Sequence, residues 1–254
     1  MIRVAAVGDV HVGPECTGQL RPSYAGLADH ADLLLLAGDL TRCGEPAEVD
    51  VLCRELDGVE VPVVAVLGNH DHHAGYPAEV TARLGEAGIH VVDGTSVVLD
   101  VDGVSVGVAG TKGFGGGFAG ASGSAFGEAE MKAFIEHTQC LADGLRDALA
   151  ILATDVRLAL LHYSPIEETL RGERLEIYPF LGSYLLAEAL DDAGCDVAFH
   201  GHAHHGTERG VTAGGTRVRN VAQPVIGRPY RVYGVEPRPD AWPVTTAAAL
   251  AEAV

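Results

Sequence analysis

Five short apolar runs of this sequence end in the same way, at a cluster of side chains that can bind a metal ion. The runs are AAVGDVH, LLLAGD, VAVLGNHD, LALLHYSP and DVAFHGHAH. Because the carboxyl ends of neighbouring strands in an open α/β sheet share one crevice, side chains that follow these strands can meet although they lie far apart in the chain. The sequence therefore predicts one site at the strand ends, and its candidate metal ligands are Asp9, His11, Asp39, Asn69, His162, His202 and His204.

The apolar runs alternate with longer segments of helical period, which is the pattern of an α/β layered fold. An Asp-Gly pair at 102–103 lies between two alternating runs and predicts a hairpin. Strands are predicted at 2–7, 33–37, 61–67, 90–92, 97–101, 104–109, 156–161 and 197–199, with a further edge strand at 215–221. Helices are predicted at 46–56, 77–86, 128–152 and 181–192.

Three segments stand outside this alternation. Residues 110–127 hold eight glycines, so we expect either a mobile flap or a disordered insertion. Residues 165–180 form a polar insert, and both segments could frame a cleft. The chain from 236 carries three prolines before an alanine-rich end, which predicts a spacer and a short helix, either disordered or docked on a partner subunit of a homo-oligomer. The expected organisation is a single domain at 1–235 and a tail at 236–254.

The charge balance limits the class of substrate. Thirty-five acidic residues against 17 basic ones give a formal net charge of -18, which disfavours a protein that binds nucleic acid through the phosphate backbone. The five cysteines are odd in number and show no Cys-X-X-Cys spacing, as is typical of a reducing compartment. The N-terminus makes a poor signal peptide, and no apolar stretch is long enough for a membrane helix. We therefore expect a cytoplasmic protein that acts on a small substrate, with no membrane partner.

The number and type of candidate ligands indicate two metal ions. Seven ligands exceed what one ion normally takes from a protein, but they suit two ions that share a bridging carboxylate. Carboxylate, amide and imidazole donors without a thiolate favour Mn, Fe or Zn over Mg or Ca. The predicted cofactors are therefore two divalent transition-metal ions.

In order along the chain, the motifs DxH, GD, GNHD, H and GHxH resemble those of the calcineurin-like metallophosphoesterases over residues 9–204. The forms GDLTRCG and GNHD are more similar to the class III cyclic-nucleotide phosphodiesterases and their bacterial relatives than to the GDxVDRG and GNHE of Ser/Thr protein phosphatases. The resemblance implies a four-layer α/β/β/α sandwich. It also implies roles by position: one metal for Asp9, His11 and His204, the other for Asn69, His162 and His202, a bridging role for Asp39 and a catalytic role for His70.

The chemistry implied is phosphoester hydrolysis without a covalent enzyme intermediate. Two cations lower the pKa of a water held between them, and the resulting hydroxide attacks phosphorus in line. His70 is adjacent to a candidate ligand and is expected to assist the leaving oxygen as general acid or hydrogen-bond donor. Asp71 is the second candidate catalytic residue, and it either orients His70 or only stabilises the loop.

Phosphodiesters, including cyclic nucleotides, are the expected substrates. A phosphomonoesterase acting on small phosphates is the main alternative because the same core can take either ester, and a metallonuclease and a noncatalytic scaffold are further alternatives. The candidate substrate contacts are Tyr163 and Arg42. For Arg42, a surface salt bridge is an equal alternative to a contact with phosphate. Phe114 and Phe118 are further candidate contacts if the glycine-rich segment is a flexible flap. The alternative is that this segment is a passive insertion.

Overall fold

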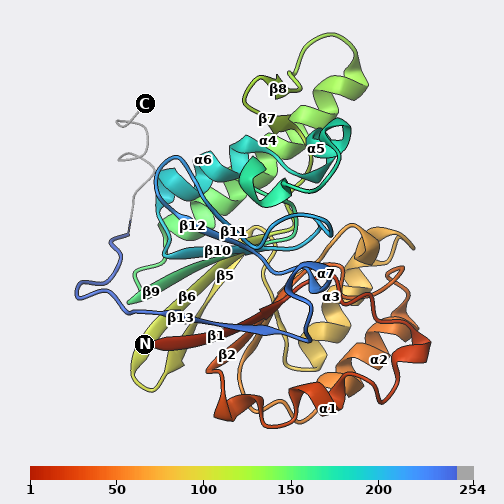
Figure 1. Ribbon diagram of the computed structural model, residues 1–254, viewed down its shortest axis with the longest axis vertical. Coiled ribbons are helices and arrows are strands. Elements are labelled where there is room, and N and C mark those ends of the chain that lie inside the picture. The colour runs from red at the N-terminus through yellow and green to blue at the C-terminus, as the bar shows by residue number, and fades with distance from the viewer. Residues whose placement is uncertain (245–254) are drawn as a thin grey trace.

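The computed structural model describes residues 1–244, and its first β-sheet contains both the first and the last strand of the chain (Figure 1). The strand order is β13-β1-β2-β3-β4, with β1 to β4 parallel and β13 antiparallel to β1. The strands are β1 (Ile2–Val7), β2 (Leu33–Ala37), β3 (Val63–Val66), β4 (His90–Val91) and β13 (Arg231–Val235).

The second sheet has the order β11-β12-β10-β9-β6-β5, with a parallel centre and antiparallel edges. Because β6, β9 and β10 are parallel, the residues that follow them meet at one edge of the sheet. The strands are β5 (Thr95–Val101), β6 (Val104–Thr111), β9 (Val156–Leu161), β10 (Val197–His200), β11 (Arg209–Val211) and β12 (Arg217–Asn220).

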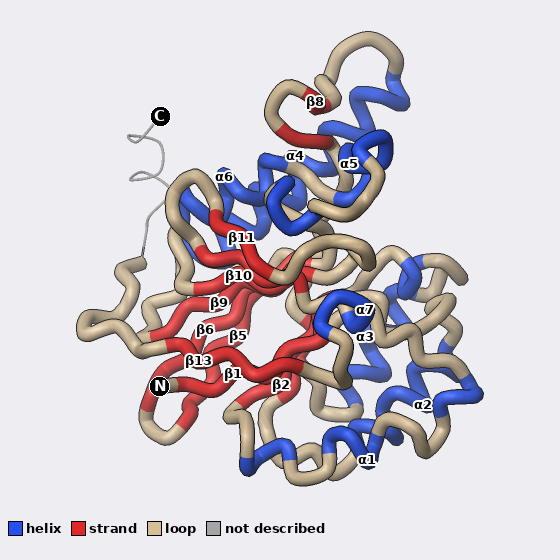
Figure 2. The backbone as a smooth tube through the Cα atoms, in the orientation of Figure 1, coloured by secondary structure: helices blue, strands red, loops and turns tan. Residues whose placement is uncertain are grey.

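Helices lie on the outer side of each sheet (Figure 2). The first sheet is covered by α1 (Arg21–Tyr24), α2 (Pro46–Leu56) and α3 (Pro77–Glu86), and the second by α4 (Ala129–Ala150) and α6 (Tyr184–Ala193). The shorter elements are α5 (Tyr178–Leu181), α7 (Gln223–Ile226), β7 (Gly117–Phe118) and β8 (Ala121–Ser122). Within residues 1–244, no helix combines the length and hydrophobicity needed to cross a membrane.

Three apolar cores separate four layers. The core between the two sheets includes Val4 and Leu35. A second core, under α2 and α3, includes Leu34 and Leu36 of the same strand, and a third, under α4 and α6, includes Leu149. Successive strand residues point to opposite faces, so β2 is apolar at all five positions because both of its faces are buried. This layering confirms the predicted α/β/β/α sandwich.

Most predicted elements are confirmed, and the differences lie at the sheet edges. The helices at 46–56 and 77–86 have the predicted bounds, and the hairpin joins β5 to β6 through Asp102 and Gly103, both at positive φ. The segment 215–221 contains β12, but β12 lies between β10 and β11, so its prediction as an edge strand is wrong. The edge strands β11 and β13 are absent from the prediction because their sequences, RGV and RVYGV, are short and lack a regular apolar period.

The first half of the glycine-rich segment is packed into the fold. The Gly116 N–H donates to the Pro179 carbonyl at 2.7 Å and the Gly117 N–H to the Gly182 carbonyl at 3.0 Å. Phe118 is buried and does not offer its ring to a substrate. This packing differs from the expected mobile or disordered insertion, because the backbone hydrogen bonds that fix the segment come from residues 179–182, which no local pattern reveals.

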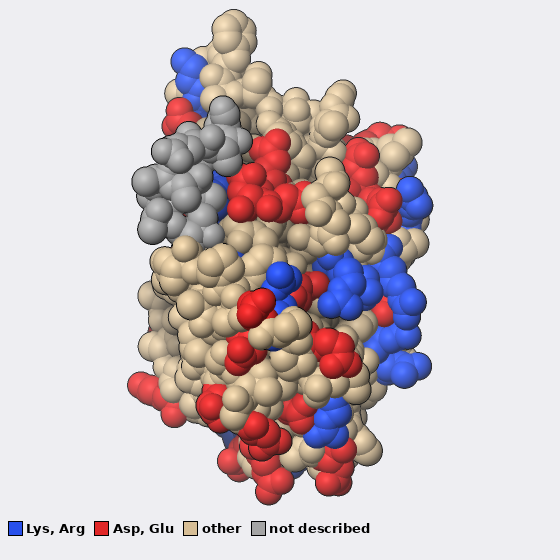
Figure 3. Space-filling view, turned by 90° about the vertical axis from the view of Figure 1, so that its left-hand side faces the viewer, with Lys and Arg blue, Asp and Glu red and all other residues tan. Residues whose placement is uncertain are grey.

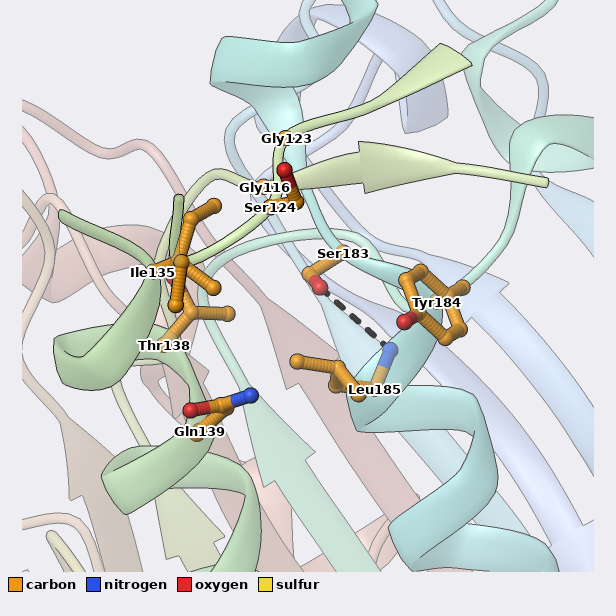
Figure 4. A pocket seen from close by; sticks show the side chains of 10 residues that line it. Gly116, Gly123, Ser124, Ile135, Thr138, Gln139, Ser183, Tyr184 and Leu185 are labelled. Carbon is orange, nitrogen blue, oxygen red and sulfur yellow. Dashed lines mark hydrogen bonds between the residues drawn. The ribbon is translucent and has the colours of Figure 1, made fainter. Parts of the chain in front are cut away.

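A cavity of about 190 Å³ lies between this segment, α4 and the start of α6 (Figure 4). Gly116, Ile135, Thr138 and Ser183 are among its lining residues. The Ser183 hydroxyl caps α6 by accepting a hydrogen bond from the Leu185 N–H at 3.3 Å. The lining residues are small, apolar or uncharged, so this cavity is separate in chemistry from the predicted metal site.

The described part of the predicted tail packs against the end of the second sheet. The Trp242 N–H donates to the Thr154 carbonyl at 2.9 Å, and its indole Nε1–H donates to Asp196 Oδ2 at 3.0 Å. The indole ring also contacts the guanidinium groups of Arg157, at 4.8 Å, and Arg238, at 4.2 Å. The helix predicted at the alanine-rich end falls on residues 245–254 and lies outside the described residues.

We expect Trp242→Ala to lower the free energy of unfolding by about 2 kcal/mol, because two cation–π contacts and one indole hydrogen bond are lost together. The loss also uncovers Arg157, whose side chain is otherwise fully buried. Chemical denaturation followed by circular dichroism measures the change. Trp242→Phe keeps a ring over the guanidinium groups and should lose less. Equal denaturation midpoints for wild type and Trp242→Ala would show that the contacts of Trp242 do not stabilise the fold.

Candidate metal centre

The predicted ligands stand on backbone that few non-glycine residues adopt. Among residues 1–244, five non-glycine residues have positive φ, and four of them are predicted ligands: Asp9 at 59°, His11 at 46°, Asp39 at 50° and His202 at 69°. Left-handed backbone costs free energy in most residues and is concentrated at functional sites. Each of the four follows a strand end, so the chain turns sharply there and aims the side chain into the space between the two sheets' carboxyl edges.

One group of donor atoms comes from the loops that follow β1, β2 and β10. One donor atom each from Asp9, His11, Asp39 and His204 falls within 4.8 Å of the others. His204 Nε2 is 2.9 Å from Asp9 Oδ1, and His11 Nε2 is 3.9 Å from Asp39 Oδ2. Two carboxylates and two imidazoles at this spacing could hold one divalent transition-metal ion.

A second group adjoins the first and shares one of its residues. Donor atoms of Asp39, His162 and His202 lie within 4.8 Å of one another. His162 Nε2 is 3.3 Å from Asp39 Oδ1 and 3.0 Å from Asn69 Oδ1. The structure thus brings all seven predicted ligands together, and Asp39 belongs to both groups, with one oxygen facing each.

Backbone carbonyls fix which ring nitrogen of two histidines faces the centre. His162 Nδ1 lies 2.9 Å from the Ala37 carbonyl, and His202 Nε2 lies 3.3 Å from the Phe180 carbonyl. A carbonyl accepts only from a ring N–H, so Nε2 of His162 and Nδ1 of His202 are left as the nitrogens that can lose their proton to bind an ion. Such outer contacts orient imidazole ligands before an ion arrives.

The close approach of the loops explains two glycines of the motifs. A Cβ on Gly68 would collide with Asp39 Oδ1, and one on Gly201 would collide with Asp9 Oδ2. Both glycines therefore let a carboxylate lie against the backbone of a neighbouring loop.

The site without its ions is held by charge pairs. Burial disfavours the protonated ring of His162, but the charge of Asp39 and the hydrogen bond to it outweigh burial and raise the pKa of His162 to about 9. Burial acts to raise the pKa of Asp39, yet His162 lowers it well below the usual range of a carboxyl group. Burial, followed by the charge of His162, lowers the pKa of His202 to about 3. A cation bound here would take the place of the proton on His162.

His70 lies beside the centre with its ring fixed at one nitrogen. Its Nδ1 is 2.7 Å from the Arg42 carbonyl, which makes Nδ1 the donor and leaves Nε2 facing the site, 3.9 Å from Asp39 Oδ2. Its backbone N–H donates to Asp39 Oδ1 at 2.8 Å, and its ring centre is 4.5 Å from that of His11. This is the position from which a ring N–H could reach a leaving oxygen.

The contacts of Asp71 and Arg42 each match one of the two alternatives that the sequence analysis leaves open. The fully buried Asp71 carboxylate accepts hydrogen bonds from the N–H groups of Leu40, Thr41 and Gly68 and from the Thr41 hydroxyl, so it ties the two ligand loops together. Of its two proposed roles, this geometry supports stabilisation of the loop. The Arg42 side chain pairs with Glu15 at 2.6 Å, which is the salt-bridge alternative, and only its carbonyl reaches His70.

The family model described as calcineurin-like phosphoesterase matches residues 2–206 of the sequence. The chain belongs to the calcineurin-like phosphoesterase family. A comparison with curated proteins gives no match.

Several solved structures share the fold of this calcineurin-like phosphoesterase. Phosphopantetheinyl hydrolase from Mycobacterium tuberculosis is 15% identical with a TM-score of 0.65, covering 92% of this chain and 96% of that one. A protein described as the anchor in the inner membrane complex of Plasmodium is 14% identical with a TM-score of 0.55, and the match covers 88% of this chain and 72% of that one. The protein TT1561 of Thermus thermophilus is 15% identical with a TM-score of 0.53, covering 86% and 88%. At these identities the likeness is one of fold alone.

Phosphoester hydrolysis in this family depends on two metal ions, and the donor atoms of the chain fit them. The two groups contain carboxylate and imidazole donors, an amide oxygen lies beside the second group, and one carboxylate is common to both. No cysteine belongs to either group among the described residues. The donor set therefore fits a pair of metal ions.

The structure places the predicted substrate contact Tyr163 beside the second group of donor atoms and, next to Tyr163, a residue to which the sequence analysis gives no role, Lys112. The Tyr163 ring centre is 4.2 Å from that of His202, and Tyr163 is 7% exposed. Lys112 follows β6 as His162 follows β9, because Thr111 and Leu161 are register partners. The sequence holds part of the signal for Lys112, which lies three residues after the strand predicted at 104–109 and directly after β6 as the structure has it.

Proposed function

We propose that this calcineurin-like phosphoesterase is a cytoplasmic phosphodiesterase that acts on small substrates such as cyclic nucleotides. The observation that carries the proposal is that Asp39 is shared by two adjoining groups of donor atoms. Mn, Fe or Zn are the proposed cofactors. One ion would be held by Asp9, His11 and His204, the other by Asn69, His162 and His202, and both by Asp39.

The two ions, when bound, supply positive charge that polarises the phosphoryl oxygens and lowers the pKa of a water. His70 directs Nε2 toward the reacting phosphorus and, when protonated there, donates to the leaving oxygen. The Arg42 carbonyl holds the ring in this orientation through Nδ1. Asp71 keeps the loops of Asp39 and His70 at a fixed distance through its hydrogen bonds to both.

A phosphomonoesterase is the second candidate, because the same pair of ions can activate either ester. The fold-level neighbour from Mycobacterium tuberculosis bears the name of a phosphopantetheinyl hydrolase, which supports phosphoester hydrolysis and does not distinguish a monoester from a diester. Nucleic acid is disfavoured by the net charge of -18. The face seen in Figure 3 carries Asp and Glu over its upper, central and lower parts, and most of its Lys and Arg side chains gather toward the right-hand edge.

Generic chromogenic esters test the proposal directly. With added Mn, we expect bis(4-nitrophenyl) phosphate to be hydrolysed with a higher kcat/KM than 4-nitrophenyl phosphate. A preference of about tenfold or more for the monoester would replace the diesterase by the phosphomonoesterase. Efficient cleavage of plasmid DNA in a gel assay would point to a nuclease. Fewer than about one transition-metal ion per chain after Mn supplementation would instead favour a noncatalytic scaffold.

A further inference from the structure

Lys112 is one of only two lysines in a chain of net charge -18, and it is buried beside the candidate metal centre. Lys112 is 8% exposed, although lysine is almost never buried without a partner. Its Nζ donates to the Gly113 carbonyl at 3.0 Å and lies 4.9 Å from the ring centre of Phe114 and 5.1 Å from that of Tyr163. An ammonium has three N–H donors, so these contacts leave part of its hydrogen-bonding capacity unused.

His72 supplies a second unused polar group, and its ring lies near enough to Lys112 to be affected by the charge of the ammonium. His72 Nε2 is buried and is the one buried side-chain nitrogen or oxygen without a hydrogen-bond partner among the described residues. Burial, followed by the positive charge of Lys112, lowers the pKa of His72. Buried polar atoms are nearly always paired, so an orphaned ring nitrogen indicates a position that a bound group satisfies.

The backbone joins this pair to the metal centre. The Lys112 carbonyl accepts hydrogen bonds from the N–H groups of His162 at 3.1 Å and Tyr163 at 3.0 Å. The Tyr163 ring then contacts the Lys112 ammonium on one side and the His202 ring on another, with ring centres 4.2 Å apart. One ring, that of Tyr163, thus separates the Lys112 ammonium from the second group of ligands.

We propose that Lys112, His72 and Tyr163 form an anion subsite that binds a second, non-scissile anionic group of the substrate, a phosphate or a carboxylate. This inference rests on the proposed function and narrows it to phosphoesters that carry an additional negative charge. An anionic group would accept from the remaining Lys112 N–H donors and from the ring N–H of His72. Aromatic contacts with the ammonium hold it in place without neutralising it.

A purely structural role for Lys112 accounts for less of what is seen. The bond to the neighbouring Gly113 carbonyl spans one residue and joins no distant element. Burial lowers the pKa of Lys112, an effect that the carboxylates of Asp93 and Asp39 oppose. An apolar side chain at this position would pack without the cost of burying an amine. Within residues 1–244, no protein group is a hydrogen-bond partner of the His72 nitrogen.

Two chromogenic diesters that differ by one phosphate test the subsite. Thymidine 5′-(4-nitrophenyl phosphate) and its 3′-phosphorylated form carry the same scissile bond. We expect wild type to have a kcat/KM about tenfold or more higher for the 3′-phosphorylated diester, since a charge-assisted hydrogen bond is gained. In Lys112→Met this ratio should fall to about one, and in Lys112→Arg much of it should remain. Lys132→Met, the same change at the exposed second lysine, should keep the wild-type ratio.

Binding measured without turnover separates the subsite from the proposed reaction. In calorimetric titrations, wild type should bind thymidine 3′,5′-bisphosphate more tightly than thymidine 5′-phosphate, and Lys112→Met should bind both alike. If neither diester is hydrolysed, the proposed function fails while this comparison still decides on the subsite. Equal affinity of wild type for the two nucleotides, or an unchanged preference in Lys112→Met, would overturn the proposal.

Discussion

Asp39→Asn is expected to lower kcat/KM for a phosphodiester by a factor on the order of 1000 or more, because one carboxylate serves both groups of donor atoms. Asparagine has nearly the same shape and tolerates the left-handed backbone that Asp39 adopts at φ 50°. What it lacks is the negative charge that would neutralise two cations. The variant should therefore fold and lose activity together with metal.

Metal content measured on the same samples identifies the cause. Wild type should retain about two transition-metal ions per chain, and Asp39→Asn fewer than about one, since neither half of the centre keeps its shared ligand. Asp102→Asn is the matched control: it makes the same change at an aspartate with φ 51°, in the exposed β5–β6 turn. If Asp39→Asn retained both ions and more than about a tenth of the activity, Asp39 would not bridge them.

The arrangement of the site was predictable because its determinants are local to each strand. Buried strands such as β2 are continuous apolar runs that can be recognised from the sequence. The residues that follow such a run lie at the carboxyl edge of the sheet, whatever place the strand takes in the strand order. The positions of Asp39, Asn69 and His162 follow from that alone. The left-handed backbone at Asp39 and His202 is consistent with motifs that place a glycine just before each ligand.

What the sequence leaves open depends on contacts between distant segments. From the sequence, the Arg42 side chain could bind either a phosphate or a carboxylate. The salt bridge with Glu15 forms because the segment at 13–16 packs beside Arg42. The glycine-rich segment is fixed by carbonyls of residues 179 and 182, which lie outside any local window. β13 is defined only by its pairing with β1, more than 200 residues earlier. None of these partners is encoded in a period or a motif.

His70→Asn is expected to lower kcat by about 100-fold or more while both metal ions are retained, because a general acid typically contributes 10²–10⁴-fold. The asparagine amide can still donate to the Arg42 carbonyl as Nδ1 does, so the loop keeps its contact. It has no group in the place of Nε2. His73→Asn, the same change at an exposed neighbour, should leave kcat near that of wild type.

The leaving group distinguishes a general acid from a residue that merely shapes the loop. A 4-nitrophenolate leaves readily as an anion, whereas an alkoxide needs a proton as the bond to phosphorus breaks. If His70 supplies that proton, His70→Asn should slow an alkyl diester far more than an aryl diester of the same nucleotide. A structural defect would slow both esters equally. Equal losses, or loss of metal from the variant, would therefore remove His70 from the chemical step and leave it a positioning residue for Asp39, whose Oδ1 accepts its backbone N–H.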